Sequence, residues 1–459
     1  MSPNRSWEGT FSALVADPPA ALFSDAALDI AALALVDLVG VTLAGTAEPA
    51  AAVVGRYLDT EGAGTASVVG RAARTTAGAA AFGNAVLGHV LDYDDSNLVI
   101  GGHPSVVIFP ALLALAEVRA LPGDAVLRAY SVGFDVAVRL ARGVNFHHYE
   151  KGWHPSATLG VFGAALGAAH LLGLDAVQAR NALGFAATSA AGVKASFGTL
   201  AKPIQLGRAA QMGVQAALLA QAGADAAAEV LTARLGFLNV YNGAGNYLAE
   251  PPAWDGVPEL LTSSLSFKNY PCCGSTHVVI DTAVDLKRRG LPDAIAAVEV
   301  AMNPRRIPHV DRPDASDPLG AKFSVQFCAA AALIDGALGL DHFTAEATAR
   351  EDIRALAGRI RLAAFDGAEA LDQPCRITVT AADGTTVSAE LPGPRGRDPA
   401  SSANVAERKF TDCASRVLPP EAVVRLWAQL RGIRDLPDVR LLMADLAATP
   451  TTSPLQRTC

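Results

Sequence analysis

The sequence predicts a mainly α-helical protein in which a large all-α helical domain is interrupted by a smaller α+β domain. Small and aliphatic residues recur at helical spacing from about Ser24 to about Ala249, and strand-like patterns begin only after about Thr262. A Pro- and Gly-rich segment, residues 392–399, then precedes a second helical stretch. We therefore expect residues 1–263 and 395–459 to form the helical domain and residues 264–394 to form the inserted domain.

Composition supports a globular protein with a large core. Of 459 residues, 51% are hydrophobic and 18% are charged, which excludes a disordered chain. Aromatic residues make up only 6%, so Ala, Leu and Val must form most of the core, as in closely packed helices. The formal charge of -8 argues against nucleic acid as the main partner, because phosphate binding needs concentrated positive charge.

The first helical stretch divides at Gly and Pro residues into separate helices. No segment in it alternates like a strand for long. Its most apolar part, residues 26–45, contains Asp29 and Asp37 and has neither the layout of a signal peptide nor an unbroken membrane span. We expect a cytoplasmic protein without a membrane partner. The predicted helices are residues 25–44, 76–91, 110–119, 123–142, 156–172, 175–191 and 204–223.

The inserted domain shows strand patterns at residues 298–302 and 360–364 and a hairpin at residues 375–391. Asp383-Gly384 in the hairpin is the signal of a two-residue turn. Helices are predicted at residues 275–288 and 324–336, and helical patterns return at 403–446. The six Cys form neither a C-x-x-C pair nor a disulfide framework, so we expect them reduced and unpaired.

An acidic cluster follows one apolar helix. Asp92, Asp94 and Asp95 come shortly before His103, and carboxylates so close together repel one another. Such a cluster indicates contact with solvent, a bound cation or a hydrogen-bonding role. The simplest alternative is a capped helix end followed by a polar loop. A second alternative is an acid-cluster catalyst of the terpene-cyclase kind. Hard cations need several oxygen ligands in a defined loop, which this spacing does not supply, so we predict no metal.

Two further clusters each stand before a helix. His154 precedes a Gly- and Ala-rich helix whose first N–H groups could bind an anion, and Ser156 or its neighbours could cap that helix. Lys202 stands in a loop before Pro203 among small apolar residues, where its ammonium could pair with a carboxylate. Lys194 competes for this role. A structural His and a solvated Lys are the alternatives.

The fourth cluster lies where the helical pattern gives way to the insertion. It combines a cation, a phenol, two thiols and an imidazole, but no tetrahedral zinc set. A nucleophilic Cys would need a neighbouring base and a lowered pKa, which a sequence does not show, so packing of small residues is the alternative for both Cys. The residues are Lys268, Tyr270, Cys272, Cys273 and His277.

The ordered set of these motifs resembles the MmgE/PrpD family, which includes 2-methylcitrate dehydratase, cis-aconitate decarboxylase and iminodisuccinate epimerase. The resemblance runs from about residue 10 to about residue 445. It implies a helical domain with an α+β lid, no cofactor, and a small di- or tricarboxylate substrate. The motifs are residues 83–85, His89, residues 91–96, 103–105, 152–154, 201–203 and 268–274, and His277.

Carried over by motif position, the resemblance implies an active site that moves a proton next to a carboxylate. Such a reaction creates an enolate-like dianion, so the site needs fixed positive charge beside an acid and a base. Lys202 and Lys268 would supply the charge, His103 and His154 would exchange protons, and Asp92 would orient an imidazole. The expected substrate-binding residues are Ser96, Tyr270, Cys272, Cys273 and His277.

Departures from the family pattern bear on the substrate. The dehydratases often carry Thr followed by Trp or His, where this chain has Ser96 and Asn97. They also often carry a Glu before the His-Pro, where this chain has residues 98–102, Leu-Val-Ile-Gly-Gly. The decarboxylases contribute a Tyr from the helix after the lid's first strand, where this chain reads residues 324–327, ending in Phe327. Cys272 and Cys273 could assist proton transfer in an epimerase.

We expect first a dehydratase acting on a hydroxylated polycarboxylate. An epimerase, isomerase or decarboxylase of a small polycarboxylate is the alternative within the same chemistry, and a non-catalytic small-molecule-binding homologue is the alternative of another class. Ala- and Gly-rich helix faces, together with the resemblance, favour a homodimer.

Overall fold

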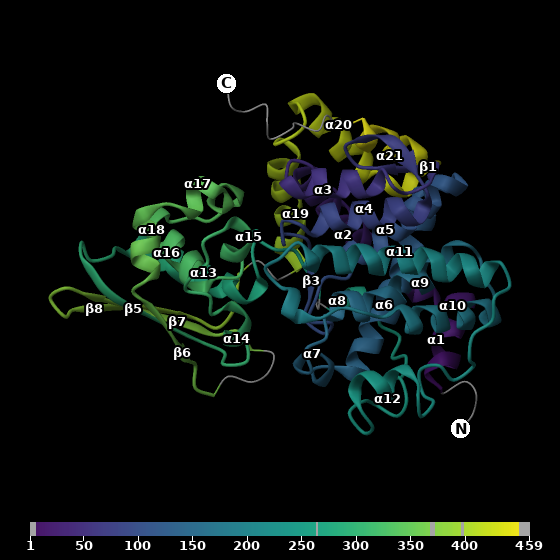
Figure 1. Cartoon of the computed structure of the whole chain (residues 1–459), viewed down its shortest axis with the longest axis horizontal. Coiled ribbons are helices and arrows are strands. Elements are labelled where there is room, and N and C mark those ends of the chain that lie inside the picture. Colours follow the sequence, from purple (N-terminus) through teal and green to yellow (C-terminus); the bar gives the residue numbers. More distant parts are fainter. Residues whose placement is uncertain (1–5, 263–264, 368–371, 396–398, 449–459) are drawn as a thin grey trace. The chain divides into compact units, whose positions relative to one another are not determined.

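A computed structural model of the chain describes residues 6–262, 265–367, 372–395 and 399–448. Internal contacts divide the chain into two compact units, and Figure 1 labels their helices and strands. The first unit consists of Met1–Ala195, Leu200–Phe267 and Asp398–Cys459, and the second of Ser196–Thr199 and Lys268–Arg397. The first is mostly helical and the second adds a four-stranded sheet, so the predicted class, mainly α with a smaller α+β part, is confirmed at this level.

Small residues let the helices of the first unit pack closely. A Cβ atom at Gly133 would lie 2.4 Å from the carbonyl oxygen of Gly163, so only glycine allows α6 and α9 to approach this far. The helices are α1 (Trp7–Ala16), α2 (Asp25–Gly45), α3 (Pro49–Leu58), α4 (Ala77–His89), α5 (Ser105–Arg119), α6 (Gly123–Val144), α7 (His147–Glu150), α8 (Pro155–Thr158), α9 (Gly160–Leu171), α10 (Ala176–Ser189), α11 (Ala201–Gln221), α12 (Phe237–Asn242), α19 (Pro399–Ala414), α20 (Pro420–Arg431) and α21 (Val439–Ala447).

Helix α2 is a core helix of the first unit. Its length and composition would allow it to cross a membrane, but 83% of its most apolar 18-residue segment is buried within the protein. It packs against α4, α6 and α19. Burial in the core therefore accounts for its apolar sequence, and Asp37 within it needs a buried partner.

Two short strand pairs in the first unit were not expected. Strands β1 (Ala63–Val68) and β2 (Arg71–Thr75) form an antiparallel hairpin, and β3 (Ser96–Asn97) pairs with β4 (Leu265–Ser266). The expectation of no strand here was wrong because β1 has three exposed residues followed by three buried ones, with no alternation of period two. The β3–β4 pair holds the chain directly after Asp95.

The second unit is built on a sheet of order β6-β5-β7-β8. Strand β5 (Ile295–Met302) runs parallel to β6 (Ile360–Ala364) and antiparallel to β7 (Cys375–Ala381), which pairs with β8 (Thr386–Leu391). Helix α13 packs on β7 and β8, and α16 packs on α13. These strands confirm the predicted ones. The helices are α13 (His277–Arg289), α14 (Ile307–Val310), α15 (Pro318–Ala321), α16 (Val325–Asp335), α17 (Ala345–Thr348) and α18 (Glu351–Ala357).

The turn between β7 and β8 differs from the predicted two-residue turn. Ala381 and Thr385 still pair, since the Ala381 amide donates to the Thr385 carbonyl at 2.8 Å, and the Gly384 amide donates to the Ala381 carbonyl at 3.0 Å. Three residues therefore connect the strands, and Gly384, at φ +86°, takes the left-handed position. This is the three-residue hairpin loop with a glycine bulge, which an Asp-Gly sequence also suits.

His148 is a buried structural histidine of the first unit. Its Nδ1 lies 2.8 Å from Asn242 Oδ1 and its Nε2 lies 2.7 Å from Thr158 Oγ1. The Asn242 amide nitrogen donates to the Val144 carbonyl at 2.9 Å, so its oxygen faces His148 and accepts the Nδ1 hydrogen. Burial lowers the pKa of His148 to about 4, so the folded protein holds this imidazole neutral.

This pKa shift predicts a pH-dependent stability. Between pH 6.5 and about 4 the unfolded chain takes up a proton at residue 148 that the folded chain refuses, so wild-type stability falls as the pH falls. Relative to His148→Gln, the wild-type free energy of unfolding should therefore drop by about 2 kcal/mol from pH 7 to pH 4.5. Urea unfolding of both proteins at the two pH values measures this. A difference that does not change with pH would contradict it.

Candidate active site

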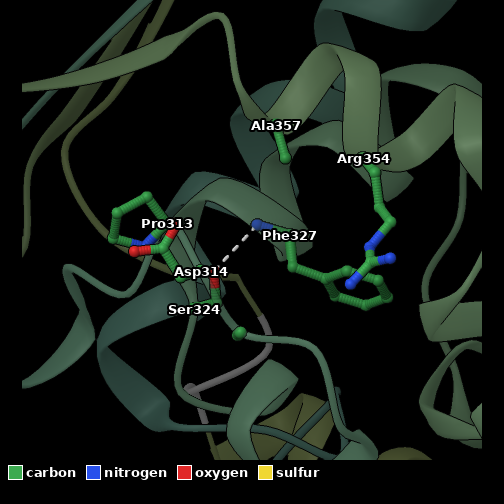
Figure 2. A pocket seen from close by; sticks show the side chains of 7 residues that line it. Pro313, Asp314, Ser324, Phe327, Arg354 and Ala357 are labelled. Carbon is green, nitrogen blue, oxygen red and sulfur yellow. Dashed lines mark hydrogen bonds between the residues drawn. The ribbon is translucent and has the colours of Figure 1, made fainter.

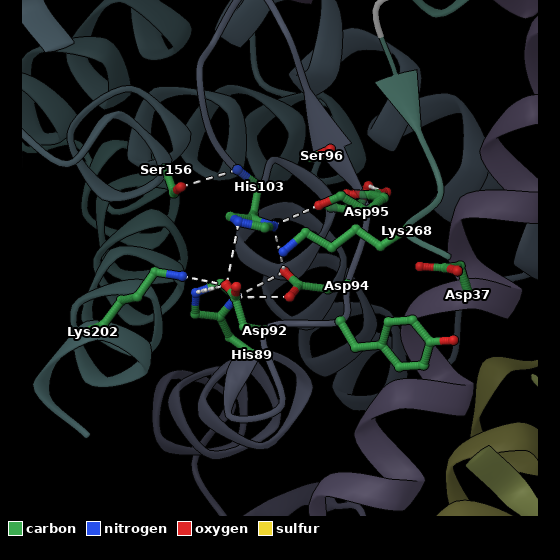
Figure 3. Close-up of polar contacts among 12 residues, drawn as sticks. Asp37, His89, Asp92, Asp94, Asp95, Ser96, His103, Ser156, Lys202 and Lys268 are labelled. Carbon is green, nitrogen blue, oxygen red and sulfur yellow. Dashed lines mark hydrogen bonds and ion pairs between the residues drawn. The ribbon is translucent and has the colours of Figure 1, made fainter. Parts of the chain in front are cut away.

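The end of α4 places an acidic turn at the centre of the site. His89 is the last residue of the helix, and Asp92 follows it at φ +52°, a left-handed conformation that Asp tolerates better than most residues. Asp92, Asp94 and Asp95 are all buried, so these carboxylates do not face solvent, which was one of the tasks that the sequence left open. Figure 3 shows their carboxylates together with His89, His103 and Lys202 of the same unit.

His89 and Asp94 form a hydrogen-bonded pair. His89 Nδ1 lies 2.8 and 2.9 Å from the two Asp94 oxygens. Burial lowers the pKa of His89 to about 4, so the neutral ring donates its Nδ1 hydrogen to Asp94. Burial alone would raise the pKa of Asp94, but the imidazoles of His89 and His103 outweigh it and hold that pKa well below its usual range. Asp94 is therefore the ionised member of the pair.

His103 is held in one tautomer. Its Nδ1 lies 2.6 Å from the backbone carbonyl oxygen of Asp95, and because a carbonyl only accepts, Nδ1 must carry the hydrogen. The other ring nitrogen, Nε2, lies 3.7 Å from Asp92 Oδ1. The His103 and His89 rings meet edge to face with centroids 4.6 Å apart. The geometry thus directs Nδ1 to the backbone and Nε2 toward Asp92.

Two glycines bring His103 to this position. Gly101 has φ +66°, and a Cβ atom at Gly102 would lie 2.4 Å from Ser156 Oγ. The His103 amide donates to that hydroxyl at 3.0 Å. Ser156 therefore binds the loop, and the predicted capping of the following helix by Ser156 is wrong; His154 is the residue at the start of α8, and it makes no side-chain cap.

Lys202 pairs with Asp92. Its ammonium contacts Asp92 Oδ1, and both side chains are buried. The sequence placed Lys202 in a loop before the helix, but α11 begins at Ala201, so the residue lies in the first turn of a helix that packs against α4. Because Lys202 lies in α11, its ammonium is buried in an ion pair and is not solvated.

His154 is oriented by a glutamine. His154 Nδ1 lies 2.8 Å from Gln205 Oε1, and Gln205 Nε2 donates to the Val193 carbonyl at 3.2 Å. The amide orientation makes Nδ1 the donor. Burial, and then the charge of Lys202, lower the pKa of His154 well below its usual range, so the ring is neutral. The first unit therefore brings Asp92, His103, His154 and Lys202 together.

Ser96 and the fourth cluster are placed separately. In the first unit, Ser96 Oγ lies 3.2 Å from Ser266 Oγ across the β3–β4 pair. In the second unit, Lys268 Nζ and His277 Nε2 both lie near the Cys272 carbonyl oxygen, at 3.0 and 3.3 Å.

The other members of the cluster make their own contacts in the second unit. The Tyr270 hydroxyl donates to Asp281 at 2.8 Å. Cys272 Sγ lies 3.1 Å from Thr276 Oγ1, and Cys273 is partly exposed. The five described cysteines are free thiols, as predicted, and Cys459 lies outside the described residues.

The second unit also contains a cavity of about 350 Å³, which Figure 2 shows from close by. The Ser324 hydroxyl on its wall accepts the Phe327 amide at 3.1 Å and donates to the Arg312 carbonyl at 2.7 Å, so this hydroxyl is fully used by the fold. Phe327 presents a phenyl ring without a hydroxyl. The lining residues are Pro313, Asp314, Ala315, Ser324, Phe327, Arg354 and Ala357.

Three residues that shape this site were not predicted individually from the sequence. His89 was named only as part of a motif, Asp94 was named only as part of an acidic run, and Gln205 was not named. A helical spacing could have found Gln205, because it follows Lys202 by three residues on α11 and so shares its face. The spacing of His89 and Asp94 carries no comparable signal, since the turn between them is irregular.

His89, Asp94 and His103 also form the one three-residue group, within the described part of the chain, whose ligand atoms lie within 4.8 Å of one another. In this arrangement only the Nε2 atoms of the two rings have a lone pair for a metal. The Nδ1 atoms of both rings carry hydrogens, directed to Asp94 and to the Asp95 carbonyl, and a protonated nitrogen has no lone pair to offer.

We expect activity to survive exhaustive treatment with EDTA followed by dialysis, because Asp94 and the Asp95 carbonyl already occupy the Nδ1 atoms of both rings. Turnover measured before and after treatment checks this. Loss of activity that a divalent metal restores would show instead that the group releases its protons and binds the ion.

The chain matches two domains of one family. Residues 9–248 match the MmgE/PrpD N-terminal domain, and residues 270–430 match the MmgE/PrpD C-terminal domain. The chain therefore belongs to the MmgE/PrpD family.

Three relatives that share one name come from two mammals and a fungus. The Cis-aconitate decarboxylases of Mus musculus and Homo sapiens are each 31% identical to the chain. The alignments cover 79% of this chain and 77% and 78% of those relatives. The Cis-aconitate decarboxylase of Aspergillus terreus is 26% identical over 85% of each chain.

Proposed function

We propose that the protein is a cofactor-independent lyase that decarboxylates a small tricarboxylate of the cis-aconitate type. The observation that carries the proposal is the buried Lys202–Asp92 pair beside Nε2 of His103, which combines fixed positive charge with a proton-exchanging group. Relatives named Cis-aconitate decarboxylase, 31% identical over most of the chain, support decarboxylation as the reaction. The sequence alone favoured a dehydratase first.

The chemistry needs a cation and an acid. The leaving carboxyl group is on a saturated carbon next to a carbon–carbon double bond. When it leaves as CO₂, the electron pair of the broken bond forms a new double bond, and the pair of the old double bond moves to a carbon beside a second carboxylate. An enolate-like dianion forms there. The Lys202 ammonium would stabilise that charge. His103 Nε2 would deliver the proton that completes the product.

We propose a supporting role for the other predicted residues. His154, neutral and fixed by Gln205, would hydrogen-bond to substrate or assist the proton transfer. Lys268 would supply the second cation that two or three carboxylates require. Ser96, Tyr270, Cys272, Cys273 and His277 stay candidates for substrate binding.

A dehydratase acting on a hydroxylated di- or tricarboxylate is the second candidate. It is favoured by Phe327, whose ring lacks the phenol that the family resemblance implies for decarboxylases. Loss of water and loss of CO₂ both pass through negative charge beside a carboxylate, so the same Lys and His would serve either reaction. An epimerase would use the same groups without losing a fragment.

One experiment separates these reactions. The enzyme is incubated in deuterated water with cis-aconitate, citrate and 2-methylcitrate, and products are followed by NMR and by CO₂ release. We expect CO₂ from cis-aconitate and one deuteron per product molecule. Loss of water from a hydroxylated acid without CO₂ would favour the dehydratase, and deuterium exchange alone would favour an epimerase. Binding measured by calorimetry without any turnover would favour the non-catalytic homologue.

A further inference from the structure

A buried ion pair lies behind the acidic turn of the proposed site. Asp37 in the middle of α2 and Lys409 on α19 are both buried, and Lys409 Nζ lies 2.7 Å from Asp37 Oδ1. Burying two charges costs more free energy than their attraction commonly returns, so stability alone does not account for such a pair. The contacts that the pair makes with other residues indicate a further role.

The first contact is with the turn before Asp94. Lys409 Nζ donates a hydrogen bond to the backbone carbonyl of Tyr93 and lies 4.3 Å from the centroid of the Tyr93 ring. A charged donor makes one of the stronger hydrogen bonds to a carbonyl, and here both groups are shielded from water. Helix α19, far along the chain, therefore holds the backbone directly between Asp92 and Asp94.

The second contact is with the turn after Asp94. Burial raises the pKa of Asp37 to about 6, while the Lys409 ammonium and the backbone amide of Asp95 act in the opposite direction. The charge of Asp37 therefore acts on Asp95 as well as on Lys409, which is its ion-pair partner. The pair thus has a direct contact with the turn at Tyr93 and an electrostatic influence at Asp95.

A third set of contacts fixes the Asp95 side chain. The Ser105 hydroxyl donates to Asp95 Oδ2, and the Tyr130 hydroxyl then donates to Ser105 at 2.6 Å, because Ser105 has only one hydrogen. Burial, followed by the charge of Asp37, raises the pKa of Asp95 well above its usual range. With its carboxyl group so anchored, Asp95 can turn its backbone carbonyl to His103.

We propose that Asp37 and Lys409 are positioning residues, which hold the Tyr93–Asp95 backbone so that the Asp95 carbonyl keeps His103 in its Nδ1-protonated tautomer. The same restraint directs Asp92 toward Lys202 and Asp94 toward His89. The catalytic consequence rests on the proposed function, whereas the restraint on the turn does not. A displacement of about 1 Å in a catalytic group is enough to lower a rate about 10²-fold.

The test replaces both charges at once. In Asp37→Leu/Lys409→Met no unpaired charge stays buried, so the protein keeps its core while the turn loses both contacts. The matched control is Asp135→Leu/Arg139→Met, which removes another buried ion pair of the first unit, on α6. Asp37→Asn, nearly unchanged in size, is the second variant should the double variant not fold.

Two readouts are measured on each protein. Hydrogen–deuterium exchange, followed by mass spectrometry, reports the protection of the peptide that contains residues 92–97. We expect exchange there to be at least about tenfold faster in the double variant, faster to a smaller degree in Asp37→Asn, and unchanged in the control. In kinetics, kcat should fall about 10- to 100-fold with KM within about twofold, and the control should keep both.

The outcomes separate the two proposals. Unchanged exchange at residues 92–97 in the double variant and in Asp37→Asn overturns the positioning role, whatever the substrate is. Faster exchange with unchanged kcat overturns its catalytic part. If the wild-type protein turns over none of the polycarboxylates, the proposed function fails, and the exchange data alone then decide whether the pair holds the turn.

Discussion

Replacing Lys202 by Met should raise KM and lower kcat, with kcat/KM falling by about 10² or more. The ammonium is buried against Asp92, so it is already desolvated and fixed before substrate arrives. Charge held in this way stabilises a developing anion without any rearrangement of the site. The loss of one such donor lowers the rate by a factor of about 10² or more. Steady-state kinetics on the substrate found by the deuterium experiment measures both constants. Lys268→Met is expected to act in the same direction.

Lys194→Met is the matched control for Lys202→Met. Lys194 is the competing cation of the same region, but its ammonium lies 3.5 Å from the centroid of the Tyr149 ring, and burial lowers its pKa to about 8. We expect kinetics close to wild type, since its charge is directed to that ring. A loss of activity in Lys194→Met with none in Lys202→Met would show that the assignment of the two lysines is reversed.

Replacing His103 by Gln should lower kcat by about 10²–10⁴ while leaving much of the substrate binding intact. The ring is set with Nδ1 on the Asp95 carbonyl and Nε2 available for proton transfer. Gln can keep a hydrogen bond in this place but cannot take up and release a proton, and proton transfer matters only in the transition state. Steady-state kinetics separates kcat from KM. His154→Gln is expected to change kcat in the same direction.

His148→Gln serves as the control for these histidine variants. His148 is as buried as His154, but Asn242 and Thr158 occupy both of its ring nitrogens. Its replacement should alter stability and leave kcat near wild type. If His103→Gln, His154→Gln and the two site lysine variants all kept wild-type kinetics, the proposed site would be wrong although the family membership would stand.

Signals that act over a few residues allowed much of the fold to be predicted. The strands of the second unit follow from Val298–Met302, Ile360–Ala364 and the Asp383-Gly384 hairpin, because alternation and turn residues are local properties. The predicted helices lie within a few residues of α2, α4 and α6 for the same reason. Where local signals were weak, as in β1 and at the start of α11, the prediction failed.

For the site, motif order and residue chemistry by themselves determined the predicted catalytic side chains: Asp92, His103, His154, Lys202 and Lys268. Their states were decided only by the tertiary structure, because burial and hydrogen-bond partners come from elements far apart in the chain. Gln205 sets the His154 tautomer and the Asp95 carbonyl sets that of His103. Lys409 reaches Tyr93 across 316 residues of sequence, a distance over which no local pattern carries information. A sequence names the titratable groups, and packing decides which of them keep their charge.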